Sequence, residues 1–413
     1  MDRDFCGLMY LYSCSVLGLE PENRGYNLKN VFKTAREQGV FDAVFLSVKK
    51  LFDRGELDVP KDEFNKLSAK FLSRCVLSIK KQDAINSLLL SMKNNGFECV
   101  LLKGYTLSRF YKYPEVRQAG DTDILIDESR EKDALKFLSD RGFTVSVRSK
   151  NGNHSECYSK KYGLVELHTK LYYNLMSDIW FDNEEMIKEP YIDVGNYKTL
   201  GITDGFLYVY LHAVKHFLSA GLSIRQVMDV LLYIREYKSK IDWQRVLGIL
   251  EKLKYKDFLF ILTKIGTEYM NFSYDETVTA EVDEGLVQAV LEDIKNSGLF
   301  GRKNNFGNDM YYAYSKKRYE KKKRGDFNKY VTQKMRGNTR AVLSFGFDNL
   351  SQRYPYLNKS KLLYPSAVFN HIYFILKTAI KKPRLVKNTV GFQQQNSEKI
   401  ETRLKELEKL KMI

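Results

Sequence analysis

The spacing of apolar residues changes twice along this 413-residue chain. Apolar side chains recur at helical spacing in residues 1–92 and again from residue 204 to about residue 272. Between these regions, residues 97–168 carry short apolar runs of strand length. This order excludes an all-helical or an all-β chain. It predicts the α/β (α+β) class, with a small mixed sheet flanked by helical regions.

The central region also contains turn signals that divide it into strands. Asn151-Gly152 between two short runs is the strongest short-range signal for a hairpin, and Gly142 ends a helix that we expect over 129–140. The resulting order is strand, helix, strand, helix, hairpin and strand, with the helices on one side of the sheet. The expected strands are 97–102, 122–126, 143–148, 155–158 and 164–168.

Four regions follow from these patterns: helices over 1–92, a sheet domain over 93–200, helices over 201–300 and a C-terminal extension over 301–413. The uncharged run 5–19 follows Asp2 and Asp4 instead of basic residues, so we read it as a buried helix and not as a signal sequence. No later apolar run is long enough to cross a bilayer, and no transmembrane segment is expected. Five cysteines without a CxxC pair indicate a reducing, cytoplasmic setting.

The positive charge of the chain is concentrated in its last quarter. Residues 301–413 contain 26 Lys and Arg against 8 Asp and Glu, a local charge of +18, whereas residues 1–300 carry −2. This Tyr-rich, basic extension favours nucleic acid or an anionic membrane surface as a partner, through residues 302–324 and 377–387. The alternatives are a solvated helix in the first segment and, over 367–380, a helix packed on the body.

An acidic motif, Gly120-Asp121-Thr122-Asp123, begins the strand expected over 122–126. Side chains two residues apart in a strand lie on the same face, so Asp121 and Asp123 converge while Thr122 points to the other face. Acid-x-acid patterns are common by chance in a chain with 51 acidic residues. The neighbouring segments therefore decide what this pair means.

Two such segments support a phosphate and metal site. Lys103-Gly104 ends one strand and leads into a helical turn, where backbone N–H groups and a lysine favour phosphate. Glu166, on the strand expected over 164–168, can reach the face of the aspartates. Three carboxylates repel one another unless a cation joins them, and Mg²⁺ carrying a nucleoside triphosphate (NTP) fits oxygen ligands best. A solvated sheet edge is the structural alternative, and Lys103 is then simply exposed.

Several of these motifs together resemble one protein family. They look like the bacterial group of uncharacterised nucleotidyltransferase family proteins, within the polymerase-beta-like nucleotidyltransferase superfamily, over roughly residues 30–240. The motifs are Leu101-Leu102-Lys103-Gly104, Tyr113-Pro114-Glu115-Val116-Arg117, Gly120-Asp121-Thr122-Asp123, Glu166-Leu167-His168 and Leu211-His212-Ala213-Val214-Lys215-His216.

The resemblance implies a nucleotidyltransferase catalytic domain over 93–200 and roles for its residues. Glu166 would hold a metal near the acceptor hydroxyl or take its proton. One departure from the superfamily is Lys103-Gly104-Tyr105, where Gly is usually followed by Gly or Ser, so Lys103 is the candidate replacement in phosphate binding. The implied catalytic metal ligands are Asp121, Asp123 and Glu166, and the implied nucleotide-binding residues are Lys103, Gly104, Arg117 and Gly120.

The implied reaction uses a two-metal Mg²⁺ site. It transfers a nucleoside monophosphate, which we expect to be AMP from ATP, to a hydroxyl of a small molecule, a glycan precursor or a protein, and it releases pyrophosphate. A second hypothesis is a binding module that holds nucleic acid or an anionic surface through the basic extension, with the acidic face inert.

Several other polar residues have two interpretations each. Arg117 either reaches a phosphate or braces the metal strand, or it pairs with a carboxylate such as Glu115. His168 either orients a substrate group or is structural.

Two helical i, i+4 pairs are open in the same way. His212 and His216 form a metal pair or, as the pattern favours, a polar contact against the catalytic domain. Arg225 and Asp229 form a surface ion pair or line the acceptor pocket.

Overall fold

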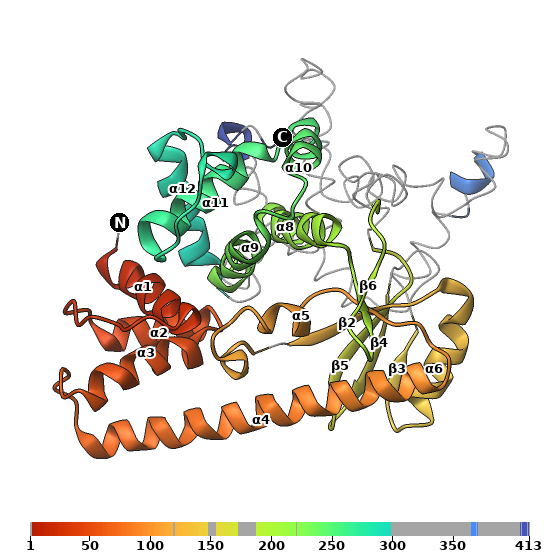
Figure 1. The fold of residues 1–413 in the computed structure, drawn as a ribbon, viewed down its shortest axis with the longest axis horizontal. Helices are drawn as coiled ribbons and strands as arrows, with labels where there is room; N and C mark the ends of the chain where they lie inside the picture. The colour runs from red at the N-terminus through yellow and green to blue at the C-terminus, as the bar shows by residue number, and fades with distance from the viewer. Residues whose placement is uncertain are drawn as a thin grey trace. The chain divides into compact units, whose positions relative to one another are not determined.

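The computed structural model describes residues 2–118, 120–147, 154–171, 187–219 and 221–298, with a few positions after 364 (Figure 1). The chain divides into two compact units, residues 1–305 with 412 and residues 306–411 with 413. The predictions for the extension, including residues 302–324, 367–380 and 377–387, lie almost entirely outside the described residues, as does the Asn151-Gly152 turn. All elements below belong to the first unit.

Four helices form the N-terminal region: α1 (Arg3–Leu17), α2 (Leu28–Glu37), α3 (Phe41–Asp53) and α4 (Lys61–Asn94). The Asp2 carboxylate caps α1 by accepting the N–H of Asp4, and Gly18 ends the helix with a φ of 74° that favours glycine. Leu8 and Leu11 inside it are fully buried. The predicted buried helix is confirmed, but it ends at Leu17, and Leu19 is exposed.

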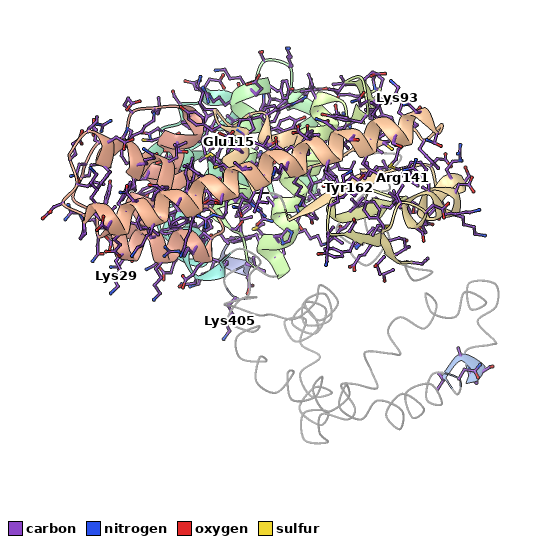
Figure 2. The ribbon with its side chains drawn as sticks, turned by 90° about the horizontal axis from the view of Figure 1, so that it is seen from below. Lys29, Lys93, Glu115, Arg141, Tyr162 and Lys405 are labelled. Atoms are coloured by element: carbon purple, nitrogen blue, oxygen red, sulfur yellow. The ribbon has the colours of Figure 1, made fainter. Side chains whose placement is uncertain are left out.

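Helix α4 connects the N-terminal helices to the sheet. It begins directly after Pro60 and runs for 34 residues. Figure 1 shows it along one side of the first unit, and Figure 2 shows it from below, with Lys93 near its C-terminal end. Its last turns bury Leu88, Leu89 and Met92 against the strands. Burial of each such side chain contributes about 1.5–3 kcal/mol to the free energy of folding.

The sheet is mixed, as the sequence predicts. Within the described residues it has the strand order β3-β4-β5-β2-β1-β7-β6. The β2/β5 and β1/β7 pairs are parallel and the other pairs are antiparallel. The pair β6/β7 was not expected, because two residues per strand are too few to show a period. The strands are β1 (Val100–Leu101), β2 (Asp121–Leu125), β3 (Thr144–Ser146), β4 (His154–Ser159), β5 (Gly163–His168), β6 (Ile192–Asp193) and β7 (Lys198–Thr199).

Helices contact both faces of this sheet, which corrects the prediction of helices on one side. On one face, Ile124 and Leu101 pack against α4 and against α6 (Glu131–Ser139), the helix expected over 129–140. On the other face, Leu125 and Leu102 form a smaller cluster with Tyr208 of α8 (Ile202–Ser219). Figure 1 shows the strands between α4 and α8. The second face is therefore partly polar and partly covered by a helix.

The second helical region follows the sheet and joins the N-terminal helices. Fully buried Gln38, after α2, donates to the carbonyl oxygen of Ile294 (2.7 Å) and accepts the N–H of Ile224 (3.0 Å). Among the described helices, none is long and apolar enough to cross a membrane. After α8, this region contains the helices α9 (Ile224–Tyr237), α10 (Trp243–Lys252), α11 (Lys256–Tyr269) and α12 (Glu284–Ser297).

Candidate active site

The three predicted carboxylates lie on two adjacent parallel strands. β2 pairs with β5 so that Asp123 lies opposite Glu166. Ile124, the next residue along β2, points into the apolar core, so Asp121, Asp123 and Glu166 share the opposite face. Their carboxylate oxygens, one from each residue, lie within 4.8 Å of one another. The structure therefore brings these three residues together, as expected.

Asp123 is the buried centre of this group. Its Oδ1 lies 3.1 Å from His168 Nε2 and 3.4 Å from Lys103 Nζ. Its Oδ2 is buried as well and has no hydrogen-bond partner among the residues that the structure describes. A buried polar atom without a partner costs about 1–3 kcal/mol, and more when the group is charged. A cation ligated by this oxygen would remove that cost.

Lys103 follows β1 and points back towards the carboxylates. Burial opposes its charge, but the attraction of Asp123, Asp121 and Glu166 is larger in sum and raises the pKa of Lys103 above its usual value. Its Nζ also lies 3.3 Å from His212 Nε2. Lys103 is therefore a charged neighbour of the acidic group and not simply an exposed lysine.

His168 and His154 extend the site along β5 and β4. His168 Nε2 lies 3.3 Å and His154 Nε2 lies 3.9 Å from Glu166 Oε2. Burial disfavours the charge on His168, but its bonds to Asp123 and Glu166 prevail and raise its pKa. Burial lowers the pKa of His154 against the attraction of Glu166.

Glu166 belongs to two groups of potential metal ligands. Burial raises its pKa, but donation by His168 and the charge of His154 outweigh burial, so the pKa is lowered. It shares one group with Asp121 and Asp123, and the other with His154 and His168. The first offers only oxygen, which suits Mg²⁺, whereas the second offers imidazoles, which suit transition metals.

Gly104 forms a tight turn after Lys103. Its φ of 75° and ψ of −92° are accessible to glycine and strained for other residues. The turn opens the short helix α5 (Tyr105–Ser108), and the N–H groups of Leu107 and Ser108 donate to the Gly104 carbonyl oxygen (both 3.2 Å). The predicted glycine turn is therefore present next to the acidic group.

Arg117 is buried and engaged by other residues than the sequence suggested. It donates from Nε and Nη2 to the two oxygens of Asp229 (2.9 and 2.7 Å), and from Nη1 to the Gly104 carbonyl oxygen (2.8 Å). Its carboxylate partner is thus Asp229 on α9 and not Glu115. Arg225, which was expected to pair with Asp229, donates to the carbonyl oxygen of Gln118 (2.6 Å).

Lys81 on α4 is a candidate functional residue that sequence analysis missed. Its Nζ donates to the Gly120 carbonyl oxygen (3.3 Å), directly before β2. Burial lowers the pKa of Lys81, although the Asp121 charge opposes this. A Cβ at Gly163 would lie 3.0 Å from Lys81 Cε, so this glycine leaves room for the lysine. No motif marks Lys81, since only tertiary packing brings it near Asp121.

His212 confirms the predicted polar contact between α8 and the catalytic domain. It is surrounded by Lys103 (3.3 Å to Nζ) and His216 (3.0 Å between the Nε2 atoms). Burial first, then the charges of these neighbours, holds the pKa of His212 well below its usual value. A neutral His212 accepts a hydrogen bond from Lys103 and so helps to place the lysine.

A match to a known protein family agrees with this geometry. No curated protein and no solved structure matches the chain. The family described as uncharacterised nucleotidyltransferase matches residues 26–271, more than half of the chain. The matched region contains every site residue described above and confirms the resemblance seen in the motifs. The chain therefore belongs to a family of enzymes, the uncharacterised nucleotidyltransferases.

Proposed function

We propose that this enzyme is a Mg²⁺-dependent nucleotidyltransferase that moves a nucleoside monophosphate from an NTP, which we expect to be ATP, to an acceptor hydroxyl. The observation that carries the proposal is the convergence of Asp121, Asp123 and Glu166, with one buried Asp123 oxygen that has no partner among the described residues. We place the activity in the cytoplasm, because the five cysteines are free, as is usual in a reducing compartment.

The residues present fit a hard divalent cation. The donor set of Asp121, Asp123 and Glu166 consists of carboxylate oxygens, which Mg²⁺ prefers. The unpartnered Asp123 Oδ2 is the position where a ligated cation lowers the cost of burial most. Bound at these oxygens, Mg²⁺ ions would lower the pKa of the acceptor hydroxyl and neutralise the triphosphate.

The chain's own residues orient the reactants. Lys103 adds positive charge beside Asp123, and the Gly104 turn offers a backbone without a side chain for close approach of phosphate. The acceptor oxygen forms a bond to the α-phosphorus while the bond to pyrophosphate breaks. Glu166, whose lowered pKa keeps it ionised, would hold a metal or take the hydroxyl proton.

The first experiment is a calorimetric titration of the protein with each NTP and Mg²⁺, repeated on the Asp121→Asn/Asp123→Asn double variant. We expect metal-dependent binding of one NTP that the double variant loses. The matched control is Asp127→Asn, an exposed acid two residues beyond β2 that caps the next turn. If no NTP binds the wild type, or the double variant binds with the same metal dependence, the proposal is wrong.

The charge distribution favours one alternative function. Residues 301–413 carry +18, so the chain would hold nucleic acid or an anionic surface through its extension, with an inert acidic face. Neutralising Lys321, Lys322, Lys323 and Arg324 should then abolish binding to RNA or to anionic vesicles, whereas the Asp121→Asn/Asp123→Asn variant should retain it.

A further inference from the structure

The buried pair of Arg117 and Asp229 joins three parts of the chain. The two side chains are only 6% and 7% exposed. Arg117 presents two parallel N–H groups to the two Asp229 oxygens, the geometry in which a guanidinium binds a carboxylate most strongly. Buried ion pairs contribute little net stability, because desolvation offsets their attraction. The pair therefore needs another explanation, and its remaining contact supplies one.

That contact is the hydrogen bond from Arg117 Nη1 to the Gly104 carbonyl oxygen, at 2.8 Å. Since the carbonyl and the following N–H point in opposite directions across a trans peptide, the bond also fixes the direction of the Tyr105 N–H. Gly104 has the freest backbone in this segment. The Leu107 and Ser108 N–H groups bind this carbonyl from within the turn, and Arg117 binds it from outside the turn.

Asp229 holds Arg117 in place and is itself held from α1. Asp229 Oδ1 accepts a third hydrogen bond, from the Tyr111 hydroxyl (3.0 Å), which in turn contacts the hydroxyl of Tyr12 on α1 (3.0 Å). Both tyrosines are buried. The Gly104 turn is thus connected through Arg117 and Asp229 to α9, and through Tyr111 to α1.

Helix α9 also holds the chain directly after Arg117. Arg225, one turn before Asp229, donates to the carbonyl oxygen of Gln118. The amide of Gln118 contacts the carboxylate of Asp42 on α3. Gln118, directly after Arg117, is therefore held by α9 through its carbonyl and by α3 through its amide.

We propose that Arg117 and Asp229 form a positioning pair that holds the Gly104 turn in its nucleotide-binding conformation, so that α9 and α1 set the affinity of the site for NTP. This rests on the proposed function, because it assigns the turn to the nucleotide. It also implies that residues 93–200 bind nucleotide only with the helical regions attached.

The test uses Arg117→Lys in the full chain, which keeps the charge but cannot bond to both Asp229 oxygens and to Gly104 together. We expect the affinity for Mg²⁺ and NTP to fall by about 10-fold to 100-fold, the range for a charge-assisted hydrogen bond. The affinity for Mn²⁺ alone, measured by electron paramagnetic resonance, should stay within about twofold. The matched control is Arg245→Lys, in a second Arg–Asp pair with Asp204, between α10 and α8.

A second readout does not depend on nucleotide. Hydrogen exchange at the N–H groups of Leu107 and Ser108, which donate to Gly104, should accelerate about tenfold in Arg117→Lys and not in Arg245→Lys. NTP affinity within twofold of wild type, or unchanged exchange at these amides, would overturn the positioning pair alone. Absence of NTP binding by the wild type would overturn the proposed function as well. Asp229→Asn should repeat the loss of affinity.

Discussion

Two buried aspartates of this enzyme, Asp123 on β2 and Asp229 on α9, have opposite surroundings. Both oxygens of Asp229 are occupied by donors from Arg117 and Tyr111. Asp123 has Lys103 and His168 at one oxygen, whereas its other oxygen has no partner in the described parts of the chain. We call Asp229 saturated, because both its oxygens accept hydrogen bonds, and it cannot ligate a cation without losing one of them. We call Asp123 unsaturated, because its unpartnered oxygen can ligate a cation without such a loss.

This difference separates structure from chemistry in a site where sequence alone suggests many acids. Asp229 and Arg117 neutralise each other within a buried network. Arg117 is thereby oriented to bind the carbonyl oxygen of Gly104. Around Asp123, three carboxylates lie within 4.8 Å of one another, and one Asp123 oxygen has no donor among the described residues. That oxygen is the position that a metal would fill.

The largest predicted effect concerns the unsaturated aspartate. In the Asp121→Asn/Asp123→Asn variant we expect nucleotidyl transfer to fall by about 1,000-fold or more, because metal ligation supplies several kcal/mol of charge stabilisation. Transfer is measured as pyrophosphate release with a mixture of hydroxyl acceptors. Asp127→Asn should keep wild-type rates. A double variant that retains more than about a tenth of the rate would show that these carboxylates are not the metal ligands.

The saturated aspartate should govern stability instead. Asp229→Asn leaves Arg117 buried without its counter-charge, and breaking such a pair costs about 3–5 kcal/mol of unfolding free energy. The measurement is denaturant unfolding of the metal-free protein. Asp123→Asn should cost less, because Lys103 keeps the attraction of Asp121 and Glu166, and exposed Asp127→Asn should stay within about 0.5 kcal/mol. Equal losses for Asp229→Asn and Asp123→Asn would remove the distinction between the two aspartates.

The sequence predicts the unsaturated group well and the saturated pair poorly. Asp121 and Asp123 follow from period-2 alternation, a property of the strand itself. Glu166 follows from a second such strand, since parallel pairing places its acid opposite Asp123. These predictions need local patterns and one pairing.

The contacts that sequence reasoning missed are made by tertiary packing. Arg117 and Asp229 are 112 positions apart, and local spacing suggested Glu115 and Arg225 as their partners instead. Lys81 on α4 binds the Gly120 carbonyl oxygen. The apolar repeat of α4 identifies a helix but does not show which strand lies beside it. Packing of α8 on the second sheet face has the same origin, because a partly polar strand face does not show which helix covers it.

A smaller effect should come from Lys103, the nearest cation to the unsaturated aspartate. In Lys103→Met we expect the affinity for Mg²⁺ and NTP to fall about tenfold, as one charge-assisted contact to phosphate is lost. The affinity for Mn²⁺ alone should rise, because Lys103 no longer competes for Asp123. Calorimetry measures both, with Lys264→Met on α11 as the control. A fall in both affinities would show that Lys103 organises the carboxylates instead of competing with the metal.

The smallest effect should be a pH dependence carried by His168 in the metal-free protein. Because its pKa is raised in the folded state by Asp123 and Glu166, its stabilisation is complete below the unfolded value of about 6.5 and is lost as pH rises through the folded value. The difference in unfolding free energy between the protein with His168 and its His168→Gln variant should therefore shrink at pH above about 6.5. Both proteins carry His154→Gln, because burial and then the charge on His168 lower the pKa of His154, and the titration of His154 would otherwise differ between them. A difference that is constant with pH, measured by denaturant unfolding with a chelator present, would mean that Asp123 and Glu166 do not raise the pKa of His168 in the folded protein.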